Sequence, residues 1–158
     1  MTKKQTLPAG RQVPKIGIII GSQSDLPVVE KATNLLSDLG IDYELLIASA
    51  HRTPKKVEQF AKSAEDKFDL IIAGAGMAAA LPGVVAAHTT LPVIGLPISS
   101  KALAGHDALF SIVQMPPGVP VACVAIDGGK NAAILAAQIL SLKYPDLKRK
   151  LKKLKGGK

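Results

Sequence analysis

Short apolar runs alternate with helical patterns along most of the chain, and this alternation constrains the fold more than any other feature. The run over residues 15–21 is rich in isoleucine and ends at Gly21, as expected of a strand buried on both faces. A helix follows, because Asp25 suits an N-cap and Pro27 is tolerated in a first turn. The same pattern predicts further strands over 43–48, 70–75, 93–96 and 121–126, and further helices over 54–64, 81–87, 108–113 and 130–142.

Strands that alternate with helices indicate βαβ units, whose right-handed crossovers place helices on both faces of a parallel sheet. We therefore predict an α/β fold, a three-layer (αβα) doubly wound parallel sheet of the flavodoxin-like type. The 158 residues suffice for one such domain and not for two. We assign residues 15–142 to this single domain, 1–14 to an N-terminal extension and 143–158 to a basic, helical C-terminal tail.

The formal net charge of +8 is concentrated in that tail. Residues 143–158 hold eight lysines and arginines against one acid, Asp146, so the rest of the chain is nearly neutral. Leu147, Leu151 and Leu154 form a helical apolar stripe, which favours packing on the body or on a neighbouring subunit. Nucleic acid or an anionic surface is the weaker alternative as a partner, since stacking aromatic residues are nearly absent.

Several classes of protein are excluded by what the sequence lacks. No apolar run approaches the roughly 20 residues that span a bilayer, and no secretory signal pattern is evident, so we expect a cytoplasmic protein without a membrane partner. The single cysteine, Cys123, lies in an apolar run and rules out disulfide scaffolds and cysteine-based zinc sites. His88 and His106 have no acids at metal-ligand spacing, so we expect surface or packing roles for them and no metal site.

Ligands of doubly wound sheets bind beyond the carboxyl ends of the strands, and polar residues stand there in this chain. After the first predicted strand, Gly-Ser-Gln-Ser-Asp (21–25) offers the hydroxyls of Ser22 and Ser24 and the carboxylate of Asp25. These groups stand where a helix begins, and a helix start attracts anions, so they suit a phosphate or a polyol. A plain turn capped by Asp25 is the alternative interpretation.

The segment after the second predicted strand, Ser-Ala-His-Arg-Thr-Pro (49–54), is dense in functional groups. His51 offers an imidazole that can carry a proton near neutral pH, and Arg52 a guanidinium suited to two-pronged phosphate binding. Ser49 adds a hydroxyl at the opening of a helix. A purely structural histidine is the alternative for His51.

After the third predicted strand the chain is composed of small apolar residues. Gly74, Ala75 and Gly76 permit close approach of the backbone to a planar ligand and expose N–H groups. The segment has no acid, base or metal ligand of its own. Tight packing of a helix on the sheet is therefore the competing explanation.

Together these segments resemble a known family, the catalytic subunit of phosphoribosylaminoimidazole carboxylase, whose bacterial form is N5-carboxyaminoimidazole ribonucleotide mutase of purine (IMP) biosynthesis. The resemblance covers about residues 14–145. Each motif stands at a predicted strand or helix end, and their order makes the match specific. The further motifs are Ala-Gly-Ala-Gly (73–76), Leu-Pro-Gly (81–83), Ser-Ile-Val-Gln-Met-Pro (111–116) and Lys-Asn-Ala-Ala-Ile-Leu-Ala-Ala-Gln-Ile-Leu (130–140).

The resemblance implies an intramolecular transferase that acts on a ribonucleotide with a 5′-phosphate. Its carboxylate moves from the exocyclic nitrogen to C4 of the ring, giving 4-carboxy-5-aminoimidazole ribonucleotide by way of retained CO2. Such an enzyme needs no ATP, metal or organic cofactor. Members of the family assemble as homo-octamers with sites at subunit contacts.

The resemblance also implies a role for each site residue. His51 matches the catalytic imidazole, and Arg52 the phosphate-binding arginine. Asp25 would accept hydrogen bonds from the ribose hydroxyls. The remaining binding residues would be Ser22 beside Asp25, Ser24 and Ser49 near the phosphate, and Gly74, Ala75, Gly76 and Leu81 around the imidazole ring and the migrating carboxylate.

The third segment departs from the usual mutase pattern, Gly-Ala-Gly-Gly-Ala-Ala-His-Leu-Pro-Gly. Here Met77 replaces a glycine and Ala80 replaces the histidine. Carboxylases that add CO2 directly to aminoimidazole ribonucleotide also have an alanine there, but this chain keeps Arg52 and Leu-Pro-Gly as the mutases do. We therefore expect a mutase, with a direct carboxylase (a lyase) as the alternative. A non-catalytic nucleotide or flavin binder and a homologue repurposed for another ribonucleotide also remain open.

Overall fold

The computed structural model describes residues 13–156, so residues 1–12 of the predicted extension and the last two residues of the tail lie outside the described part. Parallel strands form a single five-stranded sheet in the order β2-β1-β3-β4-β5. This is the flavodoxin-like order, so the predicted fold is confirmed. The strands are β1 (Lys15–Ile20), β2 (Asp42–Ile47), β3 (Leu70–Gly76), β4 (Val93–Ile98) and β5 (Ala122–Cys123).

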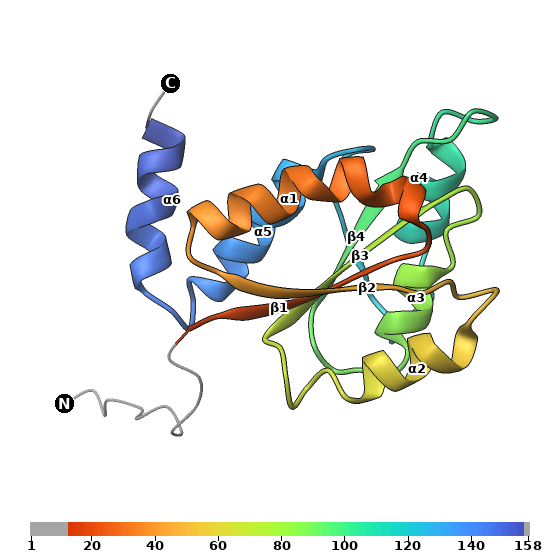
Figure 1. Cartoon of the computed structure of the whole chain (residues 1–158), viewed down its shortest axis with the longest axis horizontal. Coiled ribbons are helices and arrows are strands. Elements are labelled where there is room, and N and C mark those ends of the chain that lie inside the picture. Colours follow the sequence, from red (N-terminus) through yellow and green to blue (C-terminus); the bar gives the residue numbers. More distant parts are fainter. Residues whose placement is uncertain (1–12, 157–158) are drawn as a thin grey trace.

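Helices cover both faces of the sheet (Figure 1). On one face lie α1 (Leu26–Asp38), α5 (Gly129–Leu140) and α6 (Asp146–Gly156). On the other face lie α2 (Pro54–Lys62), α3 (Leu81–Ala86) and α4 (His106–Val113). Each layer contacts its own apolar cluster, and the three central strands are buried on both sides, which is why their sequences read as continuous apolar runs.

β5 is shorter than the strand predicted over 121–126, and the backbone of β4 gives the reason. The carbonyls of Gly95 and Pro97 face this side and accept hydrogen bonds from the N–H groups of Val124 and Asp127 at 3.3 and 2.9 Å. Pro97 has no N–H to donate in return, so the ladder ends after two residues.

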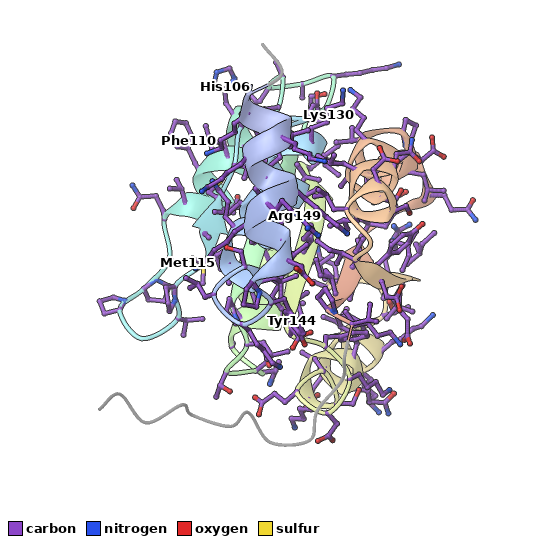
Figure 2. The ribbon with its side chains drawn as sticks, turned by 90° about the vertical axis from the view of Figure 1, so that its left-hand side faces the viewer. His106, Phe110, Met115, Lys130, Tyr144 and Arg149 are labelled. Atoms are coloured by element: carbon purple, nitrogen blue, oxygen red, sulfur yellow. The ribbon has the colours of Figure 1, made fainter. Side chains whose placement is uncertain are left out.

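A buried carboxylate joins the sheet to the C-terminal helix at the amino edge of the strands. Asp69, just before β3, accepts hydrogen bonds from the Lys15 N–H at 3.0 Å, from Lys143 Nζ at 2.7 Å and from the Tyr144 hydroxyl at 3.2 Å. Burial alone would raise the pKa of Asp69, but these donors outweigh it and hold the pKa below its ordinary value. Figure 2 shows Tyr144 at the turn that leads into α6.

The basic helix α6 packs on the body of its own chain. Leu147 and Leu151 belong to the apolar cluster beneath α1 and α5, whereas Leu154 is partly exposed. Lys150 Nζ donates to the carbonyl of Leu39, which follows α1. No helix within residues 13–156 is long and apolar enough to cross a membrane.

Candidate active site

A cavity of about 650 Å³ opens at the carboxyl edge of the sheet, where the order of the strands reverses between β1 and β3. The segments that follow four of the strands line it. The lining residues are Gly21, Ser22, Ser24 and Asp25 after β1, Ser49 to Arg52 after β2, Ala75 to Leu81 at the end of β3 and beyond, and Ser99 and Ser100 after β4. All but one of the predicted site residues are among them.

The first loop is held by its own side chains. Ser22 Oγ accepts from the Ser24 N–H at 3.3 Å, and the Asp25 carboxylate accepts from the Ser22 N–H at 3.0 Å. Asp25 stands at the predicted N-cap position of α1, but its side chain makes no capping hydrogen bond to that helix. Its carboxylate turns back to the loop instead, because a short 3₁₀ turn over Gln23–Asp25 precedes α1.

Asp25 is the most buried polar residue of the cavity, with an exposed fraction of 7%. Burial raises the pKa of its carboxyl above the ordinary value, although the Ser22 N–H and the Ser24 hydroxyl, which lies 3.4 Å away, act in the opposite direction. A carboxylate held in this way is costly to keep charged. Its polar neighbours leave it oxygen lone pairs for a ligand that donates hydrogen bonds.

The second loop is fixed by reciprocal bonds between Ser49 and Thr53. The Ser49 N–H donates to Thr53 Oγ1 at 2.9 Å, and Thr53 Oγ1 donates to the Ser49 carbonyl at 3.2 Å. His51 and Arg52, which lie between these two residues in the sequence, are exposed and line the cavity. Arg52 Nη2 donates to the Gly21 carbonyl at 3.1 Å and so connects this loop to the first one.

The third segment supplies an apolar wall. Gly76 lies so close to β4 that a Cβ there would meet the Ile98 carbonyl oxygen at 3.1 Å. Leu81 opens α3 and is buried at the base of the cavity, while Met77 and Ala78 are exposed at its mouth. An apolar wall opposite hydroxyls and charges can orient an amphipathic ring.

Gly74 is the predicted site residue that does not line the cavity. It lies inside β3, where a Cβ would meet Ile20 Cγ2 and Ile98 Cδ1 at 3.3 Å each. Its carbonyl accepts from the Gly21 N–H at 3.3 Å. Gly74 thus supports the first loop from within the sheet, whereas Ala75 and Gly76 of the same strand line the cavity.

Sequence reasoning missed Ser99 and Ser100, which line the cavity after β4. Asp127, in the loop before α5, accepts from the Ser99 N–H at 2.9 Å and from the Ser99 hydroxyl at 2.6 Å. The Ser100 hydroxyl is buried without a protein partner. Their position after a buried strand was a usable signal, since the same rule identified the other loops.

The residues outside this cavity offer less chemistry. Within residues 13–156, no three histidine, cysteine, aspartate or glutamate side chains are grouped so as to hold a metal ion. Cys123 is half-buried on β5, and burial raises the pKa of its thiol, which disfavours the reactive thiolate. His106 is exposed and its Nδ1 lies 2.8 Å from the Leu103 carbonyl.

Comparison with known proteins agrees with this geometry. A family described as AIR carboxylase matches residues 15–158. The N5-carboxyaminoimidazole ribonucleotide mutase of Pyrococcus abyssi is 61% identical over 142 residues, which are 89% of this chain and 82% of that protein. The mutase of Thermotoga maritima is 58% identical over 144 residues, 90% of this chain and 84% of that protein.

A solved structure also matches over nearly the whole chain. The crystal structure of Treponema denticola PurE has a TM-score of 0.83 and 36% identity, and the match covers 91% of this chain and 90% of that one. The resemblance drawn from the sequence motifs is thereby confirmed. Because the family model covers residues 15–158 and these mutases are 58–61% identical over most of both chains, this chain belongs to the AIR carboxylase family.

Proposed function

We propose that this chain is an N5-carboxyaminoimidazole ribonucleotide mutase of purine biosynthesis. The observation that carries the proposal is the convergence of an imidazole, a guanidinium and an apolar wall on one cavity. Relatives that bear this name share 58–61% of their residues with it over most of both chains. The product would be 4-carboxy-5-aminoimidazole ribonucleotide.

The substrate's phosphate would bind where the first two loops meet. Arg52 would supply two-pronged donation to the phosphate, and the hydroxyls of Ser24 and Ser49 line the same cavity. Asp25 would accept from the ribose hydroxyls, whose donated hydrogen bonds favour its charged form, with Ser22 beside it. The ring would then lie toward Ala75, Gly76 and Leu81.

The reaction moves one carboxylate and one proton. The carbamate C–N bond breaks and releases CO2, while the exocyclic nitrogen keeps the electron pair and takes up a proton. The electron-rich C4 of the ring then attacks the carbon of CO2, forms the C–C bond and loses its own proton. His51 lines the cavity and would donate the first proton and accept the second, so that it would end the cycle as it began.

Released CO2 must be kept from water between these two steps. The apolar residues Met77 to Ala80 form the wall that would do so. Ala79, however, has an exposed fraction of only 2% and belongs to the core beneath α2 and α3. A polar group at this position would disturb the fold as well as the pocket, so Met77 and Ala78 at the mouth are the informative positions.

The proposal includes a homo-octamer in the cytoplasm. Leu103, Phe110 and Val113, on α4 and the loop before it, are each at least half exposed, and Phe110 points away from the body in Figure 2. Apolar side chains gathered in this way favour a subunit contact. Phe110→Glu should then lower the mass of the assembly in light scattering coupled to size-exclusion chromatography. An unchanged mass would remove this face from the interface.

The test of the reaction is a paired assay on the purified protein. One arm supplies N5-carboxyaminoimidazole ribonucleotide, and the other supplies aminoimidazole ribonucleotide with bicarbonate and carbonic anhydrase. Turnover of the first alone supports the mutase. Efficient use of the second would favour the direct carboxylase that Ala80 suggests, and inactivity with both would contradict the assigned reaction.

His51→Asn separates an enzyme from a simple binder. The variant should bind the product ribonucleotide but lose turnover by at least about a hundredfold, the usual contribution of a general acid–base. Binding is measured by calorimetry and turnover by product formation. A fully active His51→Asn variant would refute the role of the imidazole.

A further inference from the structure

Met77 stands in a backbone conformation that disfavours a side chain. Its φ is +58°, in the left-handed region where glycine is the favoured residue. Within residues 13–156 only two other non-glycine residues, Ala104 and Asp127, have positive φ. Asp127 has a visible reason, because it anchors Ser99 through two hydrogen bonds.

Packing within the chain does not explain the methionine. Met77 has an exposed fraction of 67%. An exposed apolar side chain in a disfavoured conformation contributes little to folding, because it removes little surface from water. Backbone strain that no packing interaction offsets indicates that the residue has a functional role.

The position of Met77 indicates what that function is. It follows Gly76 at the end of β3, is exposed, and lines the same cavity as Asp25 and Arg52. Methionine has three rotatable bonds, and its thioether makes favourable contacts with aromatic rings. We propose that Met77 folds over the bound aminoimidazole ring and closes the apolar wall over the CO2 released between the two steps. The inference rests on the proposed mutase function.

The proposal predicts a leak when the side chain is removed. Met77→Gly restores the glycine of the usual mutase pattern but not its histidine, which is Ala80 here, so the ring face and the CO2 become open to water and part of the CO2 escapes before C4 attacks it. Met77→Leu keeps an apolar cover of similar size. Ala104→Gly is the matched control, because it relieves the same kind of backbone strain, at φ +51°, outside the residues that line the cavity.

The experiment follows the carboxyl carbon. Substrate labelled with ¹³C in its carbamate is converted in the presence of unlabelled bicarbonate and carbonic anhydrase, and mass spectrometry measures the label that remains in the carboxylated product. Wild type and Ala104→Gly should retain nearly all of it. Met77→Gly should raise the lost fraction about tenfold, which corresponds to lowering the barrier to CO2 escape by about 1.4 kcal/mol, and Met77→Leu should restore most of the retention. Thermal unfolding of Met77→Gly should begin no earlier than that of wild type.

The outcomes separate this inference from the function on which it rests. If wild type makes no labelled product, the mutase assignment fails. If wild type retains the label and Met77→Gly retains it equally, the mutase stands and the covering role is refuted. A changed assembly mass in Met77→Gly with full retention would instead assign Met77 to a subunit contact and would equally overturn the proposal.

Discussion

Replacing Asp69 by asparagine removes the charge that joins the amino edge of the sheet to the C-terminal helix. The carboxylate has an exposed side-chain fraction of 6% and accepts from Lys15 N–H, Lys143 Nζ and the Tyr144 hydroxyl. Asparagine keeps one acceptor oxygen but presents an NH₂ group to one or more of these donors. Lys143 is 46% exposed and can return its charge to water. We therefore expect the free energy of unfolding to fall by about 2 kcal/mol. This value lies in the range for hydrogen bonds to charged groups and below the range for leaving a buried charge unpaired.

The assay is urea unfolding at one fixed protein concentration, because the proposed assembly would tie stability to concentration. The pKa of Asp69 is lowered in the fold, so its contribution is present above the unfolded-state pKa and is lost as the pH falls through the folded-state pKa. The difference in unfolding free energy between wild type and Asp69→Asn should be complete at pH 7, and it should disappear as the pH falls below 3.8, the ordinary pKa of the group. Asp146→Asn is the matched control, since its carboxylate is 92% exposed and 3.9 Å from Arg149, and it should leave stability unchanged. A gap under about 0.5 kcal/mol at neutral pH, or one that persists in acid, would refute the reasoning.

Three further changes test the site and the helix. Arg52→Lys should raise KM about tenfold or more with a smaller effect on kcat, because the compact ammonium lacks the planar fork that can donate to the Gly21 carbonyl and pair with a phosphate at the same time. Equal losses in both constants would contradict a binding role. Asp25→Asn should weaken binding of the product ribonucleotide in calorimetry while leaving the unfolding free energy at neutral pH equal or higher, since burial disfavours the charge; lower stability with normal affinity would argue against a ribose contact. Leu151→Ala should cost about 2–3 kcal/mol in urea unfolding and Leu154→Ala under about 1, because only the former is buried; equal values would mean that α6 does not pack as described.

The fold could be predicted from the sequence because the signal repeats. The isoleucine runs of β1 and β3 are buried on both faces, and that burial leaves no polar alternation to confuse the pattern. The short edge strand β5 was overestimated because its limit is set elsewhere, by the missing N–H of Pro97 on the neighbouring strand. A property of the partner strand cannot be read from the segment itself.

The site could be predicted as far as one rule applies, namely that ligands of such sheets bind beyond the carboxyl ends of the strands. Ser22, His51 and Leu81 line the cavity because each belongs to the segment that follows a strand, and the sequence locates the ends of strands within a residue or two. Gly74 does not line the cavity, because it lies inside β3 between the side chains of Ile20 and Ile98. The contact of Arg52 with Gly21 joins residues that are 31 positions apart, so no local pattern indicates it. The same rule applies to Ser99, which follows the fourth strand, but no motif of the sequence marks that strand end.

The cavity and the described ends of the chain lie on opposite edges of the sheet. β1 begins beside Asp69, the turn into α6 meets the same carboxylate, and Figure 1 shows the start of β1 and helix α6 on that side, away from the loops that line the cavity. A polypeptide joined just before β1 or just after α6 would therefore start on the side of the sheet opposite the cavity. The architecture is therefore that of a module, which can be joined to other polypeptides at its base while its mouth stays open.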